Sequence, residues 1–205
     1  MNIRITERDI EMMKIITKYR FMTANQIRIL AGFSSLNTCD RRLKKLIETK
    51  YIIRKYFLYG MPALYFVSKQ AQVFFNLEYI TTNVRLNTLE HDIQVINTAI
   101  YFIKKMNIQE NDIITERELR HEDGFAVPKH KPDFIYAKNC VEVELSEKSK
   151  IAFKKIVQDN YLTYDTQYWI TDNPKVKRNL EEMQKSYGNI EIIKLKEVQE
   201  YVKSL

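Results

Sequence analysis

The sequence is poor in residues that break regular structure or cross-link a chain. Glycine and proline number only four each among 205 residues, so long disordered linkers are not expected. The two cysteines, Cys39 and Cys140, lie far apart and form neither a metal-binding spacing nor a disulfide framework. We therefore expect two reduced thiols in a cytoplasmic protein.

Other absences narrow the range of functions. No apolar run approaches the ~18 residues that a membrane span needs, and the first residues lack the apolar core of a signal peptide. No glycine-rich loop is present to cradle a phosphate, which disfavours ATP hydrolysis. The three histidines make no metal motif of the kind a tyrosine relaxase would use, and we expect His121 and His130 at the surface. No membrane partner is expected.

The positive charge is concentrated in the first part of the chain. The whole chain carries a net charge of +7. Residues 1–80 hold 14 Lys and Arg against 6 Asp and Glu, a net charge of +8, and the rest hold 19 against 20, or −1. A basic excess confined to one region indicates a polyanion as the partner of that region.

Three amphipathic helices are predicted within the first 50 residues. Thr6 caps the first, Thr23 caps the second and Gly32 ends it. Ser34 or Ser35 caps the third helix. The buried stripe of the third helix is expected to consist of Leu36, Leu43, Leu46 and Ile47.

The outer faces of the third helix are polar at its start and basic after that. A two-stranded wing should follow, with strands over 51–58 and 63–67 and a turn over 59–62. This order is the sequence form of a winged helix-turn-helix, in which early helix residues reach base edges and later cations contact phosphates. The candidate DNA-contacting residues are Ser35, Asn37, Thr38, Arg41, Arg42, Lys44, Lys45, Arg54 and Lys55. A basic helix of a protein-interaction domain is the alternative.

The second half has the pattern of a mixed α/β sheet. We expect a winged-helix domain over 1–80, a linker over 81–88 and an α/β domain over 89–205. The expected elements are a helix over 89–106, a strand-like segment over 113–119, a polar loop over 120–131, a hairpin over 132–145, a helix over 147–161, a strand over 167–171, a helix over 173–187, a strand over 190–195 and a helix over 196–202.

The hairpin gathers carboxylates on one face. With Lys138-Asn139 as a two-residue turn, Ile135 pairs with Glu142 and Asp133 with Glu144. Strand alternation then places Asp133, Glu142 and Glu144 together, opposite an apolar face. Like charges placed opposite each other are unfavourable, and a divalent cation is one means of compensating them.

This arrangement resembles the PD-(D/E)xK nuclease superfamily, in which acidic residues on adjacent strands hold Mg²⁺. The resemblance implies Asp133 and Glu142 as metal ligands, with Glu144 beside them at the position that usually holds lysine. Lys148 could then stabilise the attacking water. An earlier acid, Glu90 or Glu116, would complete a Mg²⁺ or Mn²⁺ site.

The whole chain also looks like the replication-relaxation family of plasmids, phages and integrative elements. The matching features are the N-terminal winged helix, Leu89-Glu90-His91-Asp92 with Asn97, Glu116-Arg117-Glu118-Leu119-Arg120, Pro132-Asp133, Val141-Glu142-Val143-Glu144-Leu145-Ser146 with Lys148, and Tyr161. The resemblance implies a mobile-element protein that acts in replication, conjugation or transcriptional control.

Three functions remain open at this point. The first is a site-specific binder of double-stranded DNA, acting as a homodimer beside replication or transfer machinery, with a degenerate nuclease-like domain. The second is a Mg²⁺- or Mn²⁺-dependent endonuclease steered by its winged helix. The third is a protein-binding adaptor without a DNA partner, which would lack the steep salt dependence of phosphate binding.

Overall fold

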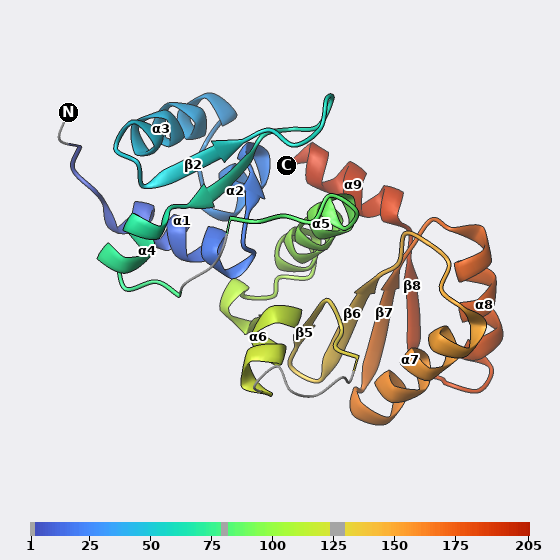
Figure 1. Cartoon of the computed structure of the whole chain (residues 1–205). Coiled ribbons are helices and arrows are strands. Elements are labelled where there is room, and N and C mark those ends of the chain that lie inside the picture. The colour runs from blue at the N-terminus through green and yellow to red at the C-terminus, as the bar shows by residue number, and fades with distance from the viewer. Residues whose placement is uncertain (1–2, 79–81, 124–129) are drawn as a thin grey trace. The chain divides into compact units, whose positions relative to one another are not determined.

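The computed structural model describes residues 3–78, 82–123 and 130–205 (Figure 1). The first residue of the expected linker and the centre of the expected polar loop lie outside these ranges. Contacts divide the chain into two compact units, 1–96 and 97–205, with the boundary inside helix α5 (Leu89–Lys105). No helix in the described ranges is long and apolar enough to span a membrane. The protein is of mixed α and β structure.

The first unit consists of short helices and a three-stranded antiparallel sheet. Along the chain its elements are α1 (Glu7–Lys18), β1 (Met22–Thr23), α2 (Ala24–Leu30), α3 (Leu36–Glu48), β2 (Ile52–Lys55), β3 (Leu64–Val67) and α4 (Lys69–Phe74). The strands lie in the order β1-β3-β2, so β2 is an edge strand. Figure 1 shows α3 leading directly into β2.

Side-chain caps explain where these helices begin. The hydroxyls of Thr6 and Thr23 each accept from the backbone three residues on, and the side chain of that third residue returns to the capping residue, which makes a capping box in both cases. Ser35 caps α3 by accepting from the backbone N–H of Thr38. Gly32 follows α2 with a φ of +67°, a conformation that glycine adopts without a steric cost. The helix starts predicted from the sequence are confirmed.

The buried stripe of α3 differs from the prediction at its first residue. Leu43 and Leu46 are buried, and Cys39 is buried in line with them. Leu36, the first residue of the helix, is 43% exposed. The stripe therefore starts one turn later than expected, because Cys39 packs inward, where its thiol approaches the Ala24 carbonyl oxygen at 3.7 Å.

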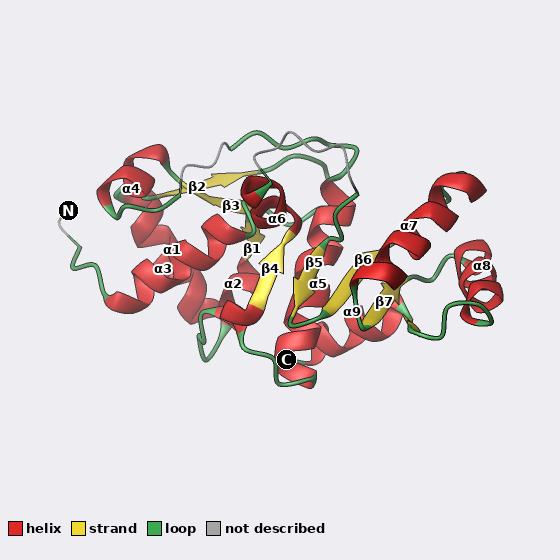
Figure 2. Ribbon diagram, turned by 90° about the horizontal axis from the view of Figure 1, so that it is seen from below, coloured by secondary structure: helices red, strands yellow, loops and turns green. Residues whose placement is uncertain are grey.

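The second unit contains a five-stranded mixed sheet. After α5, its elements are a 3₁₀ turn (Glu110–Asp112), β4 (Ile113–Thr115), α6 (Glu116–Glu122), β5 (Phe134–Tyr136), β6 (Asn139–Val143), α7 (Lys150–Thr163), β7 (Thr166–Ile170), α8 (Pro174–Gln184), β8 (Ile190–Ile193) and α9 (Leu195–Ser204). Strands β4, β5 and β6 form an antiparallel meander, and β7 and β8 add to β6 in parallel. Figure 2 shows β4 to β7 following one another across the sheet.

Helices cover both faces of this sheet. On one face Phe102 of α5 contacts the rings of Phe134, Tyr136 and Tyr168, at centroid distances of 5.7, 5.5 and 5.2 Å. On the other face α7 and α8 enclose an apolar core around Trp169, whose ring lies 5.0 Å from Phe153. The face under α7 is also the face that carries Glu142, since Glu142 and Trp169 are partners in the parallel ladder.

The turn of the β5–β6 hairpin lies one residue earlier than predicted. The turn residues are Ala137 and Lys138, and Ala137 has a φ of +47°. Ile135 consequently pairs with Cys140, where the prediction paired it with Glu142. The observed register places the fully buried Phe134 opposite the fully buried Val141, so packing outweighs the preference of asparagine for the turn.

This error changes the partners of the carboxylates but not their face. A one-residue shift of the turn moves each pairing by two residues, and two residues is the period of strand alternation. Continuing the observed register places Asp133 beside Glu142, where the prediction had placed it opposite Glu144.

Two candidate site residues lie on elements other than those predicted. Glu116 was expected on a strand, but the strand ends at Thr115, which forms a capping box with Glu118 and starts α6. Lys148 was expected on a helix, but α7 begins at Lys150 with Ser149 as its cap. Lys148 therefore lies in the connection between β6 and α7.

Candidate nucleic-acid interface and carboxylate cluster

The outer face of α3 presents cations to solvent. Arg41, Lys44 and Lys45 are exposed together with Asn37, and in the described part of the chain none of the three cations forms an ion pair. The Arg41 side chain makes a weak hydrogen bond from Nε to the carbonyl oxygen of Asn37, at 3.4 Å. These side chains are available to phosphates and to base edges.

Ser35 and Thr38, both predicted to contact DNA, are engaged at the start of the helix. The Ser35 hydroxyl accepts from the backbone N–H of Thr38 at 3.2 Å and lies 2.9 Å from the Thr38 hydroxyl. Ser35 is exposed, whereas Thr38 is half-buried. Their first role is therefore to cap α3 and so to fix its direction.

Arg42, also predicted to contact DNA, is held inside the first unit. Its Nε donates to Asp9 Oδ1 at 2.7 Å, its terminal nitrogen contacts Asp9 Oδ2, and the same nitrogen donates to the Arg4 carbonyl oxygen at 2.9 Å. Burial alone would raise the pKa of Asp9, but hydrogen bonds from Arg42 and Thr6 outweigh it and hold that pKa below its ordinary value. Arg42 thus joins α3 to α1.

The two cations of β2 also differ from each other. The guanidinium of Arg54 lies over the rings of Tyr56 and Tyr65, 4.8 and 5.8 Å from their centroids, and its side chain is exposed. Lys55 donates from Nζ to the carbonyl oxygen and the hydroxyl of Thr82, at 3.2 and 3.0 Å. Arg54 is thus exposed to solvent, whereas Lys55 is bonded to Thr82.

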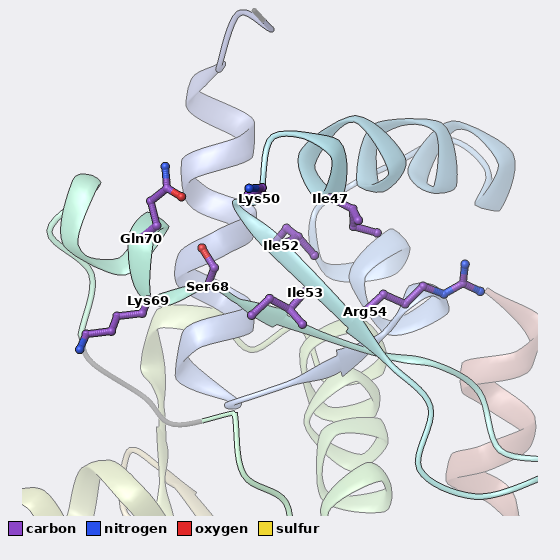
Figure 3. A pocket seen from close by; sticks show the side chains of 8 residues that line it. All are labelled: Ile47, Lys50, Ile52, Ile53, Arg54, Ser68, Lys69 and Gln70. Carbon is purple, nitrogen blue, oxygen red and sulfur yellow. The ribbon is translucent and has the colours of Figure 1, made fainter. Parts of the chain in front are cut away.

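A shallow hollow of about 570 Å³ lies where the end of α3, β2 and the start of α4 meet (Figure 3). Its floor is apolar, and its edge carries cations from β2, from α4 and from the turn between α3 and β2. The lining residues are Ile47, Lys50, Ile52, Ile53, Arg54, Ser68, Lys69 and Gln70. No acidic residue lines it, so the hollow extends the basic surface beyond the end of α3.

In the second unit, the carboxylate of Glu142 is buried and held by two side chains. Only 4% of the residue is exposed. Its Oε1 contacts Nε2 of His130 at 2.6 Å and accepts from the Asn160 amide at 3.0 Å. Burial is the main cause that raises the pKa of Glu142, and the charge of Asp133 raises it further.

The pKa of His130 is shifted in the direction that this contact with Glu142 favours. Burial disfavours the charged imidazole, but the Glu142 carboxylate outweighs that effect and raises the pKa of His130. Both shifts favour a proton held between the two side chains. The prediction that His130 is a surface residue is wrong, because it is half-buried and bonded to Glu142. The alternation of residues along the hairpin could not predict this contact, because His130 lies before the strand.

Asp133, Glu144 and Glu116 also have protein partners, whereas Glu90, the alternative earlier acid, is exposed in the first turn of α5. Asp133 Oδ2 accepts from the backbone N–H of Val143 at 2.7 Å. The buried carboxylate of Glu144 pairs with Lys148 and accepts from the Ser146 backbone at 3.3 Å. Glu116 Oε1 accepts two bonds from Arg120, at 2.8 and 2.7 Å.

These acidic residues do not form a metal-binding group in the described structure. No cluster of three or more His, Cys, Asp or Glu side chains in residues 3–78, 82–123 and 130–205 has a geometry suited to a metal ion. Asp133 and Glu142 are brought together, and Glu144 and Lys148 both lie in the connection that follows β6. Glu116 is near Asp133 through its backbone, because its N–H donates to the Asp133 carbonyl oxygen at 2.9 Å. Its carboxylate belongs to the pair with Arg120.

Comparison with known proteins adds no identification. No protein-family model matches the chain, and no curated protein matches its sequence significantly.

Proposed function

We propose that the protein is a site-specific double-stranded DNA-binding protein of a mobile genetic element. It acts in plasmid or phage replication, conjugation or transcriptional control. The observation that carries the proposal is the outer face of α3, where Arg41, Lys44 and Lys45 are exposed and form no ion pairs in the described structure. A helix face that keeps three cations unpaired in a unit of high positive charge is suited to a polyanion.

The order of the first unit supports a winged helix-turn-helix. Helices α1 to α3 and the β2–β3 hairpin follow the order predicted for such a module, and β1, which was not predicted, adds a third strand to the sheet. In that module the helix before the wing enters the major groove, and here this helix is α3. Binding as a homodimer to a repeated site would match the symmetry common to such readers.

A degenerate PD-(D/E)xK-like fold is the proposal for the second unit. The antiparallel meander β4-β5-β6, extended in parallel by β7 and β8, supports the likeness. Three of the acidic candidates are already paired with a basic side chain, since Glu142 has His130, Glu144 has Lys148 and Glu116 has Arg120. These cations supply the charge that a divalent ion would otherwise provide.

The proposal is tested by measuring salt-dependent binding to the DNA that lies upstream of the protein's own coding sequence. We expect tighter binding to one duplex from that region than to a scrambled duplex, and an affinity that falls steeply with salt because phosphate contacts release counterions. Fluorescence anisotropy at several salt concentrations measures both. Weak binding without sequence preference or salt slope would leave the protein-binding adaptor as the better explanation.

An endonuclease is the second candidate, because Asp133 and Glu142 interact electrostatically with each other and Lys148 pairs with the nearby Glu144. Metal binding there would require His130 and Lys148 to release the carboxylates they now pair with. We expect no cleavage of supercoiled plasmid carrying the upstream region, in Mg²⁺ or Mn²⁺, and no Mn²⁺ uptake by calorimetry.

Asp133→Ala is the control for that assay. Nicking or linearisation by the wild type, absent in Asp133→Ala, would establish the endonuclease and locate its site on the hairpin. Retarded mobility of uncut plasmid with both proteins is the result that the DNA-binding proposal expects.

A further inference from the structure

The connection between β2 and β3 exposes an unusual amount of aromatic and apolar surface. We call residues 56–61 the wing loop. Tyr56 is 66%, Leu58 47% and Tyr59 107% exposed. Figure 1 shows this connection extending beyond the sheet of the first unit. Side chains of this size are seldom left in water at the tip of a loop without a partner.

The loop is built so that these side chains point outward. Phe57 turns inward and its ring lies 6.1 Å from that of Phe66, which is fully buried. Beyond it the chain turns at Gly60, with a φ of +79°, and the Met61 N–H donates to the Leu58 carbonyl oxygen at 3.3 Å. Phe57 therefore anchors the base of the loop and Gly60 forms the turn at its tip. Tyr59 lies between these two residues.

The charges around the loop indicate a nucleic acid as its partner. Residues 49–77 contain Lys50, Arg54, Lys55 and Lys69 but no Asp or Glu. The guanidinium of Arg54 lies over the Tyr56 ring. Exposed aromatic rings next to arginine and lysine provide both the stacking surface and the countercharge that nucleic-acid bases and phosphates require.

We propose that the wing loop stacks Tyr59 on DNA bases while α3 contacts the same duplex. This inference rests on the proposed function and adds to it a contact that opens or distorts the base stack. Partly unstacking a base step costs free energy, and side chains that wedge into DNA recover it through the extra contacts that the deformed DNA allows. Leu58, next to Tyr59, would fill the widened step.

Substitutions at Tyr59 test the contact on the duplex identified by its salt-dependent binding. Base–aromatic stacking contributes ~1–3 kcal/mol, so Tyr59→Ala should weaken binding by about five- to a hundredfold without changing the salt slope. Tyr59→Trp should keep the affinity, and DNA should quench the fluorescence of the introduced tryptophan. Tyr161→Ala and Tyr161→Trp are the matched controls, because Tyr161 is an exposed tyrosine of α7 in the second unit. Tyr161→Ala should leave the DNA affinity unchanged, and DNA should not quench the fluorescence of the tryptophan in Tyr161→Trp.

The outcomes separate this inference from the proposed function. Equal affinity of Tyr59→Ala and wild type, or an unquenched tryptophan at position 59, overturns the stacking while DNA binding through α3 stands. Self-association that depends on Tyr59 in sedimentation velocity, with unchanged DNA affinity, would make the loop a protein interface. Absence of any salt-dependent binding by the wild type overturns both.

Discussion

Replacing Arg42 by alanine is expected to lower the free energy of unfolding by about 3 kcal/mol, because removal of one partner leaves a buried carboxylate uncompensated. The side chain of Asp9 is 1% exposed and that of Arg42 is 19% exposed. The same substitution at the neighbouring, exposed Arg41 should change that free energy by less than about 0.5 kcal/mol. Two adjacent arginines of α3 thus have separate roles.

The Arg42–Asp9 pair should also give stability a pH dependence. The pKa of Asp9 is held below its ordinary value in the folded protein. A lowered pKa stabilises the fold above the pKa of the unfolded state, which is about 4, and the stabilisation disappears as pH falls through the lower folded-state value. The difference in stability between wild type and Arg42→Ala should therefore shrink below about pH 4.

Urea denaturation followed by far-UV circular dichroism measures this difference. The one tryptophan, Trp169, lies in the second unit, so its fluorescence would report on the wrong part of the chain. Asp9→Asn should be destabilising on its own and should reduce the further effect of Arg42→Ala, since the two side chains act as a pair. A stable Arg42→Ala variant that has lost DNA affinity would instead return Arg42 to the DNA interface.

Local signals were enough to predict the helix starts of the first unit, but not strand β1 or the early end of β2 at Lys55. A helix starts where a polar side chain accepts a hydrogen bond from the backbone N–H three residues later. Thr6, Thr23 and Ser35 each do this, and such residues can be recognised in the sequence. The role of Arg42 could not be predicted in the same way. It depends on a contact between α3 and α1, 33 residues apart, and periodicity along one helix carries no information about a partner on another.

The hairpin shows a similar limit in the second unit. Alternation correctly predicted which side chains share a face, since it depends only on the period of the strand. The register depended on the packing of Phe134 against Val141 and was predicted wrongly. The pairing of Glu142 with His130 and Asn160 joins three separate segments. Only the three-dimensional structure brings these segments together, and the compensation of the buried carboxylate was therefore missed.

The sequence contains a helix start at Glu116, although a strand-like segment was predicted there. Thr115-Glu116-Arg117-Glu118 has the spacing of a capping box, in which the first hydroxyl and the fourth carboxylate satisfy each other's backbone. The capping box outweighs the preference of the β-branched residues before it for a strand, and it ends the strand at Thr115. Glu116 therefore lies in the first turn of a helix, where its carboxylate meets Arg120 one turn on.

Removing the cations of α3 is expected to have the largest effect on DNA binding. The triple substitution of Arg41, Lys44 and Lys45 by alanine should weaken binding to the cognate duplex on the order of a hundredfold or more. Each lost phosphate contact reduces the salt slope by about 1, and a lost arginine contact to a base costs ~1–3 kcal/mol. Because Ser35 and the buried stripe remain, α3 should stay folded.

The single and double variants divide this effect between bases and phosphates. Arg41→Ala should weaken binding to the cognate duplex more than to a scrambled one, since an early helix residue reads base edges. Lys44→Ala with Lys45→Ala should weaken both equally and reduce the salt slope by about 2. Anisotropy titrations on both duplexes over a series of salt concentrations distinguish the two patterns.

A second pair of adjacent lysines provides the matched control. Lys154 and Lys155 are exposed on α7 in the second unit, and their replacement by alanine removes the same charge from the chain. If this pair lowers the affinity and the salt slope as much as Lys44 and Lys45 do, binding depends on net charge and α3 is not the reading helix. If only the α3 variants lose affinity, the DNA-binding surface lies on α3.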